Sequence, residues 1–101
     1  MTILHTVNKS PFDKNSLESC LKHTTEGSAV LLIEDGVYGA LKNTAISSDL
    51  KSAMPNVSIY ALEADVQARG IDSNLLDGIE LIDYKGFVEL SIKHDKVQSW
   101  L

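Results

Sequence analysis

The sequence predicts an α/β fold: a mainly parallel sheet of four to five strands flanked by helices. Two observations lead to this class. Short apolar runs alternate with helix-like segments along the whole chain, as expected when helices connect parallel strands. In addition, residues 29–33 are apolar at every position, which is typical of a central strand buried on both faces. The length of 101 residues predicts a single domain spanning residues 1–101.

The first elements can be placed from their boundaries. Ile3, Leu4 and Val7 mark a strand at the N-terminus, and residues 8–11 form a loop because they combine small polar residues with proline. Asn15 is expected to cap a helix, and Glu18 three residues later completes a capping box. The helix is expected to run to about residue 26 and to stop at a glycine.

The same alternation continues through the middle of the chain. After the apolar strand, a second helix starts at Asp35 or Gly36 and extends through Leu41. The further segments expected are a polar turn at 43–48, a helical turn at 49–54, a strand at 57–62, a short helix at 63–69 and a strand at 79–82.

The segment 84–93 fits two patterns. Val88, Leu90 and Ile92 alternate with polar residues, as in a strand, whereas Tyr84, Phe87, Val88 and Ile92 share one helical face. We favour a helix, because the strand before it needs a covering element. Near the chain end, a tryptophan at position 100 is expected either in the core or at an interface.

Composition excludes several classes of function. The net charge of −5 argues against direct nucleic-acid binding, which needs a basic face. No apolar run approaches the roughly 20 residues of a membrane span, and the N-terminus does not have the pattern of a secretory signal. One cysteine cannot form an internal disulfide, so we expect the protein in the reducing cytoplasm.

Cys20 is the main candidate for chemistry. Leu17, Cys20 and Leu21 share one helical face, which predicts a packed thiol under the helix. A reactive thiolate is the alternative, because Cys20 lies in the second helical turn and Lys22 and His23 are close in sequence. The sequence leaves both possibilities open.

Other sites have weaker signals. Cys20 and His23 have the spacing of two metal ligands, but no second pair follows, so we expect no metal. Glu34 and Asp35 follow a buried strand, where open α/β sheets bind ligands, although a helix cap and turn explain them better. No glycine-rich phosphate loop is present, so no nucleotide cofactor is expected.

Five stretches resemble the DsrH/TusB family of sulfur-relay subunits: LHTVNKSPF, LLIEDGVYGAL, IYALEADVQARG, LIDYKGFVEL and the closing VQSWL. The resemblance implies a DsrE-like fold. It also implies assembly with DsrE/TusD-like and DsrF/TusC-like subunits into a hexamer with two copies of each. Such a complex passes persulfide sulfur to a DsrC/TusE-type acceptor, without a cofactor. In the Tus branch the sulfur reaches 2-thiouridine in tRNA, and in the Dsr branch the complex serves the oxidation of stored sulfur.

Cys20 bears on the choice of branch. The segment Glu18-Ser19-Cys20-Leu21 resembles the DsrH form, whereas TusB proteins typically lack this cysteine. The resemblance therefore favours a relay subunit in sulfur oxidation, a carrier rather than a stand-alone enzyme. Cys20 would be the persulfide carrier and His23 would tune its thiolate weakly. Two alternatives stay open: a role in tRNA thiolation, and an assembly subunit whose DsrE/TusD-like partner holds the principal persulfide cysteine.

Overall fold

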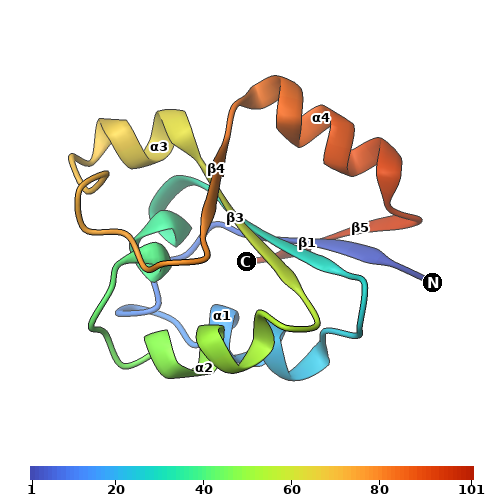
Figure 1. Cartoon of the computed structure of the whole chain (residues 1–101), viewed down its shortest axis with the longest axis horizontal. Coiled ribbons are helices and arrows are strands. Elements are labelled where there is room, and N and C mark those ends of the chain that lie inside the picture. Colours follow the sequence, from blue (N-terminus) through green and yellow to red (C-terminus); the bar gives the residue numbers. More distant parts are fainter.

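The computed structural model describes residues 1–101 and contains one five-stranded sheet in the order β4-β3-β2-β1-β5, with all neighbouring strands parallel (Figure 1). The strands are β1 (Ile3–Val7), β2 (Ala29–Leu32), β3 (Ser58–Leu62), β4 (Glu80–Ile82) and β5 (Lys96–Trp100). The helices are α1 (Ser16–His23), the 3₁₀ helix η1 (Glu34–Ala40), α2 (Ser47–Ala53), α3 (Glu63–Ala68) and α4 (Tyr84–Lys93).

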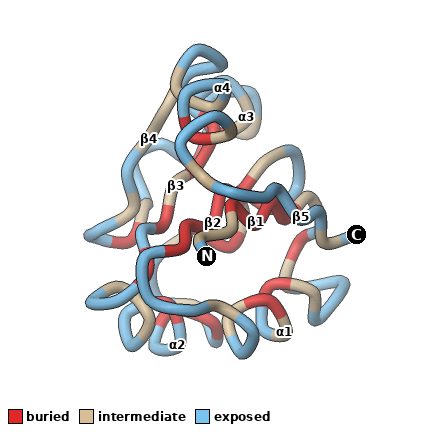
Figure 2. The backbone as a smooth tube through the Cα atoms, turned by 90° about the vertical axis from the view of Figure 1, so that its right-hand side faces the viewer, coloured by how far each residue is buried: buried red, intermediate tan, exposed pale blue.

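Helices lie on both sides of the sheet. Helices α1 and α2 lie on one side, whereas α3 and α4 lie on the other (Figure 1). The larger hydrophobic cluster contains residues of α1, η1 and α2. The smaller cluster joins Leu90 of α4 to Leu4, Ala29 and Leu31 of β1 and β2. Every residue of β2 is buried, and the central strands are the buried middle of the molecule in Figure 2. The parallel α/β sheet expected from the sequence is therefore confirmed.

Helix α4 settles the ambiguous segment 84–93. Asp83 caps it, because the Asp83 Oδ1 accepts a hydrogen bond from the Gly86 backbone N–H at 2.8 Å. Leu90 is buried against the sheet, and Phe87 packs beside it. The residues predicted to share one helical face therefore have different surroundings. Phe87 lies on the sheet, whereas Tyr84 and Val88 remain exposed.

The end of α1 differs from expectation. The helix ends at His23, and Thr24 is already extended with a ψ of 146°. The Thr24 hydroxyl donates to the Leu21 carbonyl at 2.9 Å, so it satisfies an end carbonyl that another turn would have used. The predicted capping box is also wrong, because the Asn15 side chain makes no capping hydrogen bond.

The segment after β2 is a 3₁₀ helix rather than an α-helix. It packs very close to the end of β1, since a Cβ on Gly36 would lie 2.0 Å from the Val7 carbonyl oxygen. Glu34, the first residue of η1, has a φ of 50° and so occupies the left-handed region. Only glycine at position 36 allows η1 to pack this close to Val7. The chain turns sharply at Glu34, between β2 and η1.

The strand β5 was not predicted as an element from the sequence. Its residues pair in parallel with β1, so that Trp100 lies beside Val7. Four of its five residues are exposed, because β5 forms one edge of the sheet. No helix in the structure has the length and apolar character needed to cross a bilayer.

Candidate functional site

Cys20 lies in the core beneath α1. Its side chain is 0% exposed and belongs to the same hydrophobic cluster as Leu17 and Val7. Burial raises the pKa of the Cys20 thiol to about 12, because the apolar surroundings disfavour the thiolate. The geometry therefore gives Cys20 the properties of a packed apolar residue.

The two neighbours expected to tune this thiol, Lys22 and His23, have other partners. Lys22 Nζ lies 3.5 Å from the Glu18 carboxylate in an exposed ion pair. The His23 Nδ1 is 2.8 Å from the Ser19 carbonyl oxygen, to which it donates. The His23 ring lies 5.7 Å from the Trp100 ring, measured between centroids. Cys20 and His23 are thus neighbours in sequence that form no hydrogen bond with each other.

A second histidine lies deeper than His23. His5 on β1 is 1% exposed, and the Trp100 Nε1–H donates a hydrogen bond to its Nδ1 at 3.0 Å. This bond requires an unprotonated Nδ1, so the proton of the neutral ring lies on Nε2. Burial lowers the pKa of His5 most, and the charges of His23 and His94 lower it further. The pair ties the C-terminal strand to the first strand.

The His5–Trp100 contact was not recognised from the sequence. The available signal was a histidine inside the apolar run of β1, which indicates a polar group that needs a buried partner. The His5 Nε2 is buried and has no hydrogen-bond partner. The tryptophan was expected in the core or at an interface, and it packs partly buried against the larger core cluster.

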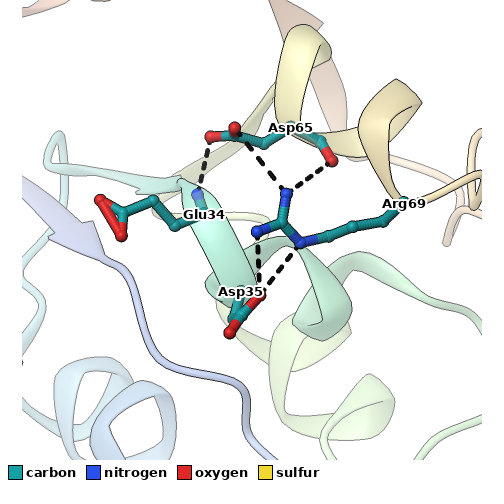
Figure 3. A network of polar contacts seen from close by, with 4 residues as sticks. All are labelled: Glu34, Asp35, Asp65 and Arg69. Atoms are coloured by element: carbon teal, nitrogen blue, oxygen red, sulfur yellow. Dashed lines mark hydrogen bonds and ion pairs between the residues drawn. The ribbon is translucent and has the colours of Figure 1, made fainter.

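The carboxylates at the end of β2 belong to a network with α3 (Figure 3). Arg69 donates from Nε and Nη2 to Asp35 Oδ1 at 3.1 and 2.9 Å. Asp65 Oδ2 accepts from the Glu34 backbone N–H at 2.7 Å. Arg69 Nη1 also donates to the Asp65 carbonyl oxygen at 3.1 Å, and it lies 3.8 Å from the Asp65 carboxylate.

This network has a structural role. The Arg69 guanidinium neutralises Asp35, and the Asp65 side chain holds the strained backbone of Glu34 in place. In Figure 3 the Glu34 carboxylate points away from the other three side chains. The two carboxylates adjacent in sequence are therefore not brought together as an acid–base pair. The expected helix cap is also absent, because Ile33 precedes η1 and makes no side-chain capping hydrogen bond, whereas the expected turn is present at Glu34.

The surface hollows lie elsewhere. The largest, of about 500 Å³, is an open groove between the loop after β1, α1 and α2, and it includes Asp13, Glu18 and Asp49. Cys20 lines none of the four hollows in the structure. No group of three or more histidine, cysteine, aspartate or glutamate side chains is arranged to hold a metal ion.

Comparison with known proteins identifies the family. The profile of the family described as DsrH-like protein matches residues 9–97. The chain is 35% identical over 98 residues to the protein TusB of Pectobacterium parmentieri, a match that covers 97% of this chain and 100% of that protein. The chain belongs to the DsrH/TusB family. The protein TusB of Escherichia coli K12 is also 35% identical over 98 residues, with the same coverage. Membership confirms the resemblance seen in the five sequence stretches.

The names of these relatives do not favour the branch suggested by Cys20. Both are TusB proteins, as is a relative from Photorhabdus laumondii that is 35% identical over 100 residues, with coverage of 97% of this chain and 100% of that protein. The preference for the DsrH form rested on the single segment around Cys20, whereas the similarity to TusB extends over nearly the whole chain.

Solved structures agree on the fold. The ychN protein of Escherichia coli superposes with a TM-score of 0.85, and the match covers 99% of both chains at 20% identity. Protein MTH1491 of Methanobacterium thermoautotrophicum superposes with a TM-score of 0.68 and covers 96% of both chains at 16% identity. At these identities the likeness concerns the fold alone, and it agrees with the small parallel α/β domain expected from the sequence.

Proposed function

We propose that this chain is an assembly subunit of a cytoplasmic sulfur-relay complex. Its partners are a DsrE/TusD-like and a DsrF/TusC-like subunit, in a hexamer with two copies of each, and the complex passes persulfide sulfur to a DsrC/TusE-type acceptor. Family membership supports the relay. The complete burial of Cys20 supports an assembly role for this subunit, with the persulfide chemistry on the DsrE/TusD-like partner.

The argument from Cys20 is chemical. A carrier thiol attacks the outer sulfur of a persulfide, so it must be ionised and accessible. Burial raises the pKa of Cys20 to about 12, so the thiol stays protonated near pH 7, and its side chain has no exposed surface. Both requirements fail in the folded subunit, whereas a packing role needs neither.

The proposed recipient pathway is the synthesis of 2-thiouridine in tRNA. The support is the identity to TusB proteins over nearly the whole chain. TusB proteins typically lack a cysteine at this helix position, so a subunit in which Cys20 only packs suits that pathway. Direct contact with tRNA is not part of the proposal, because the chain has a net charge of −5.

A second candidate is Cys20 as a persulfide carrier in sulfur oxidation. Its support is the DsrH-like segment Glu18-Ser19-Cys20-Leu21, and His23 could then act on the thiolate. This role requires α1 to move away from the sheet when partners bind, because the thiol is enclosed in the isolated subunit. The two candidates therefore differ in whether Cys20 is needed.

The test is complementation in a strain of the encoding organism that lacks this subunit. Nucleoside mass spectrometry measures the 2-thiouridine content of tRNA. We expect 2-thiouridine to disappear in the deletion strain and to return fully with the wild-type chain. Cys20→Ala should restore it to the same level, because alanine is tolerated at a small apolar position in this core.

Two results would contradict parts of the proposal. Unchanged 2-thiouridine in the deletion strain, together with impaired use of stored sulfur, would assign the subunit to sulfur oxidation. If Cys20→Ala assembles with its partners but restores no 2-thiouridine, Cys20 is a carrier. A second variant, Cys20→Val, separates packing from chemistry, because it also lacks a thiol yet fills the space. If the subunit has an assembly role, whichever of the Cys20→Ala and Cys20→Val chains folds should restore 2-thiouridine.

A further inference from the structure

Two aspartates in the chain are followed directly by glycine, at Asp35–Gly36 and at Asp77–Gly78. In such a pair the glycine backbone nitrogen can attack the side-chain carboxyl carbon of the aspartate, because the two groups are held close together and close a five-membered ring. Glycine favours this attack, since it has no Cβ to limit rotation of the peptide plane. The two pairs have very different surroundings in the folded protein.

The Asp35–Gly36 pair is held in place on both residues. Asp35 Oδ1 accepts two hydrogen bonds from Arg69, at 3.1 and 2.9 Å. The Gly36 backbone N–H donates to the Ile33 carbonyl oxygen at 2.8 Å, and Gly36 is buried. Gly36 also lies against the Val7 carbonyl, which limits any rotation of its peptide plane. Ring closure at this pair therefore requires these hydrogen bonds to break and the packing to open.

The Asp77–Gly78 pair has none of these restraints. Both residues are exposed, and they form the centre of a turn between Leu76 and Ile79. The turn is closed by a single hydrogen bond of 3.3 Å, from the Ile79 N–H to the Leu76 carbonyl oxygen. Neither the Gly78 N–H nor the Asp77 carboxylate has a hydrogen-bond partner or an ion pair. Nucleophile and carboxyl group are thus both free to meet.

We propose that Asp77 is a site of spontaneous isomerisation to isoaspartate, whereas the fold protects Asp35 from the same reaction. The Gly78 nitrogen forms a bond to the Asp77 Cγ, and a water molecule leaves, made from a carboxyl oxygen and the amide hydrogen. Water then adds to the main-chain carbonyl carbon of Asp77, whose bond to Gly78 breaks. The main chain afterwards runs through Cγ, and the former main-chain carbonyl is a free carboxylate. One water leaves and one enters, so the mass is unchanged and no oxidant or reductant is needed.

The contrast between the two sites is a difference in rate. At Asp35 the reacting arrangement forms only after the hydrogen bonds from Arg69 and from the Gly36 N–H have been lost, which adds to the barrier. At Asp77 no such bond has to break. We therefore expect isomerisation at Asp77 to be about tenfold faster or more than at Asp35 in the folded protein.

The isomer should disturb one edge of the sheet. The turn packs against α2, because a Cβ on Gly78 would lie 2.6 Å from Met54 Sδ. Glu80 begins β4 two residues later, and β4 pairs with β3 through three residues only. Isoaspartate lengthens the main chain by one carbon atom, so it moves the turn relative to Met54 or displaces the start of β4. We expect faster amide hydrogen exchange in β4 after isomerisation.

The test compares the folded full chain, its fold verified by circular dichroism, with the same chain unfolded in guanidinium chloride. Both samples are incubated at one temperature and pH, and peptide mass spectrometry with fragmentation that distinguishes isoaspartate from aspartate measures the isomer at each position. In the unfolded chain we expect similar rates at Asp35 and Asp77, because both precede glycine. In the folded chain we expect the isomer at Asp77 alone.

Asp77→Glu is the matched variant. It keeps the charge in the turn, but its longer side chain would have to close a six-membered ring, so we expect no isomer at position 77 and no change in the exchange of β4 with time. Equal rates at Asp35 and Asp77 in the folded chain would overturn the protection of Asp35. Isomer at Asp77 in the unfolded chain but not in the folded one would overturn the proposed site. Unchanged exchange of β4 in the isomerised fraction would overturn the effect on the sheet edge.

Discussion

At Cys20, favourable packing and thiol reactivity make opposite demands. Full burial removes apolar surface from water, which stabilises the fold. The same burial raises the pKa of the thiol to about 12 and withdraws the nucleophile from solution. A cysteine at such a position in a sequence can therefore be either packed or reactive, and only its surroundings in the folded protein distinguish the two. In this subunit the surroundings favour packing.

His5 makes stability depend on pH. Its pKa in the folded protein is lowered from 6.5, first by burial and then by His23 and His94. Below pH 6.5, His5 binds a proton in the unfolded chain but not in the folded protein, until the pH falls to its lowered pKa. The free energy of unfolding should therefore fall as pH falls. Urea unfolding followed by circular dichroism from about pH 7.5 to about pH 5 measures this loss.

Substitution at His5 identifies the source of that dependence. His5→Gln should reduce the slope of stability against pH, because the group that resists protonation is gone. Trp100→Phe should keep most of the slope, since burial rather than the hydrogen bond is the largest cause of the shift. An unchanged slope in His5→Gln would show that other groups carry the effect.

At the scale of single elements, η1 depends on a glycine. Gly36→Ala would place a methyl group 2.0 Å from the Val7 carbonyl oxygen, so backbone must move. We expect a loss of about 1–3 kcal/mol in the free energy of unfolding. Gly39→Ala is the control within the same element, because its new methyl group would crowd a side-chain end, Leu17 Cδ2 at 2.6 Å, and no backbone atom. Equal losses for both variants would contradict the role of the close approach.

The junction between η1 and α3 depends on Asp65. Asp65→Ala removes the hydrogen bond to the Glu34 backbone N–H and one partner of Arg69. We expect a loss of about 1–2 kcal/mol, at the low end for a charge-assisted hydrogen bond because the site is partly exposed. Glu63→Ala, also in the first turn of α3, should change stability by less than about 0.5 kcal/mol. Similar values for both would show that the network contributes nothing.

Element positions follow from local pattern where burial dominates. The apolar strands β1 to β3 appear within one or two residues of the expected ranges. The end of α1 depends instead on one hydroxyl, since Thr24 satisfies the Leu21 carbonyl and stops the helix early. Arg69 is spaced four residues from Asp65, as in a local helix pair, but its shorter contact is with Asp35, which lies 34 residues earlier. Local spacing cannot supply such a contact.

At the scale of the whole molecule, the two ends of the chain are joined. The Thr2 backbone N–H donates to Asp95 Oδ2 at 2.8 Å, and Trp100 donates to His5 across 95 residues. The edge strand β5 is mostly exposed, so it lacks the apolar run by which strands are recognised in sequence. Its identity as a strand comes from pairing with β1, which only the folded chain provides.

The two sides of the sheet differ in their hydrophobic clusters and in the apolar residues they leave exposed. The larger core cluster joins α1, η1 and α2 to the sheet, also includes Val66 of α3, and encloses Cys20. The opposite side has a small cluster and leaves Tyr84, Val88 and Ile92 of α4 exposed. An assembly subunit needs this combination of a closed core and an uncovered apolar surface. A carrier would need an accessible thiol instead.

The most direct test of the assembly role is intact-mass spectrometry of the subunit within its assembled complex, after exposure to a persulfidated DsrE/TusD-like partner. The proposal predicts that this chain gains no sulfur atom, while the partner subunit carries the persulfide. A mass increase of one sulfur atom on this chain, lost on reduction and absent in Cys20→Ala, would contradict it and would make Cys20 a carrier in the relay.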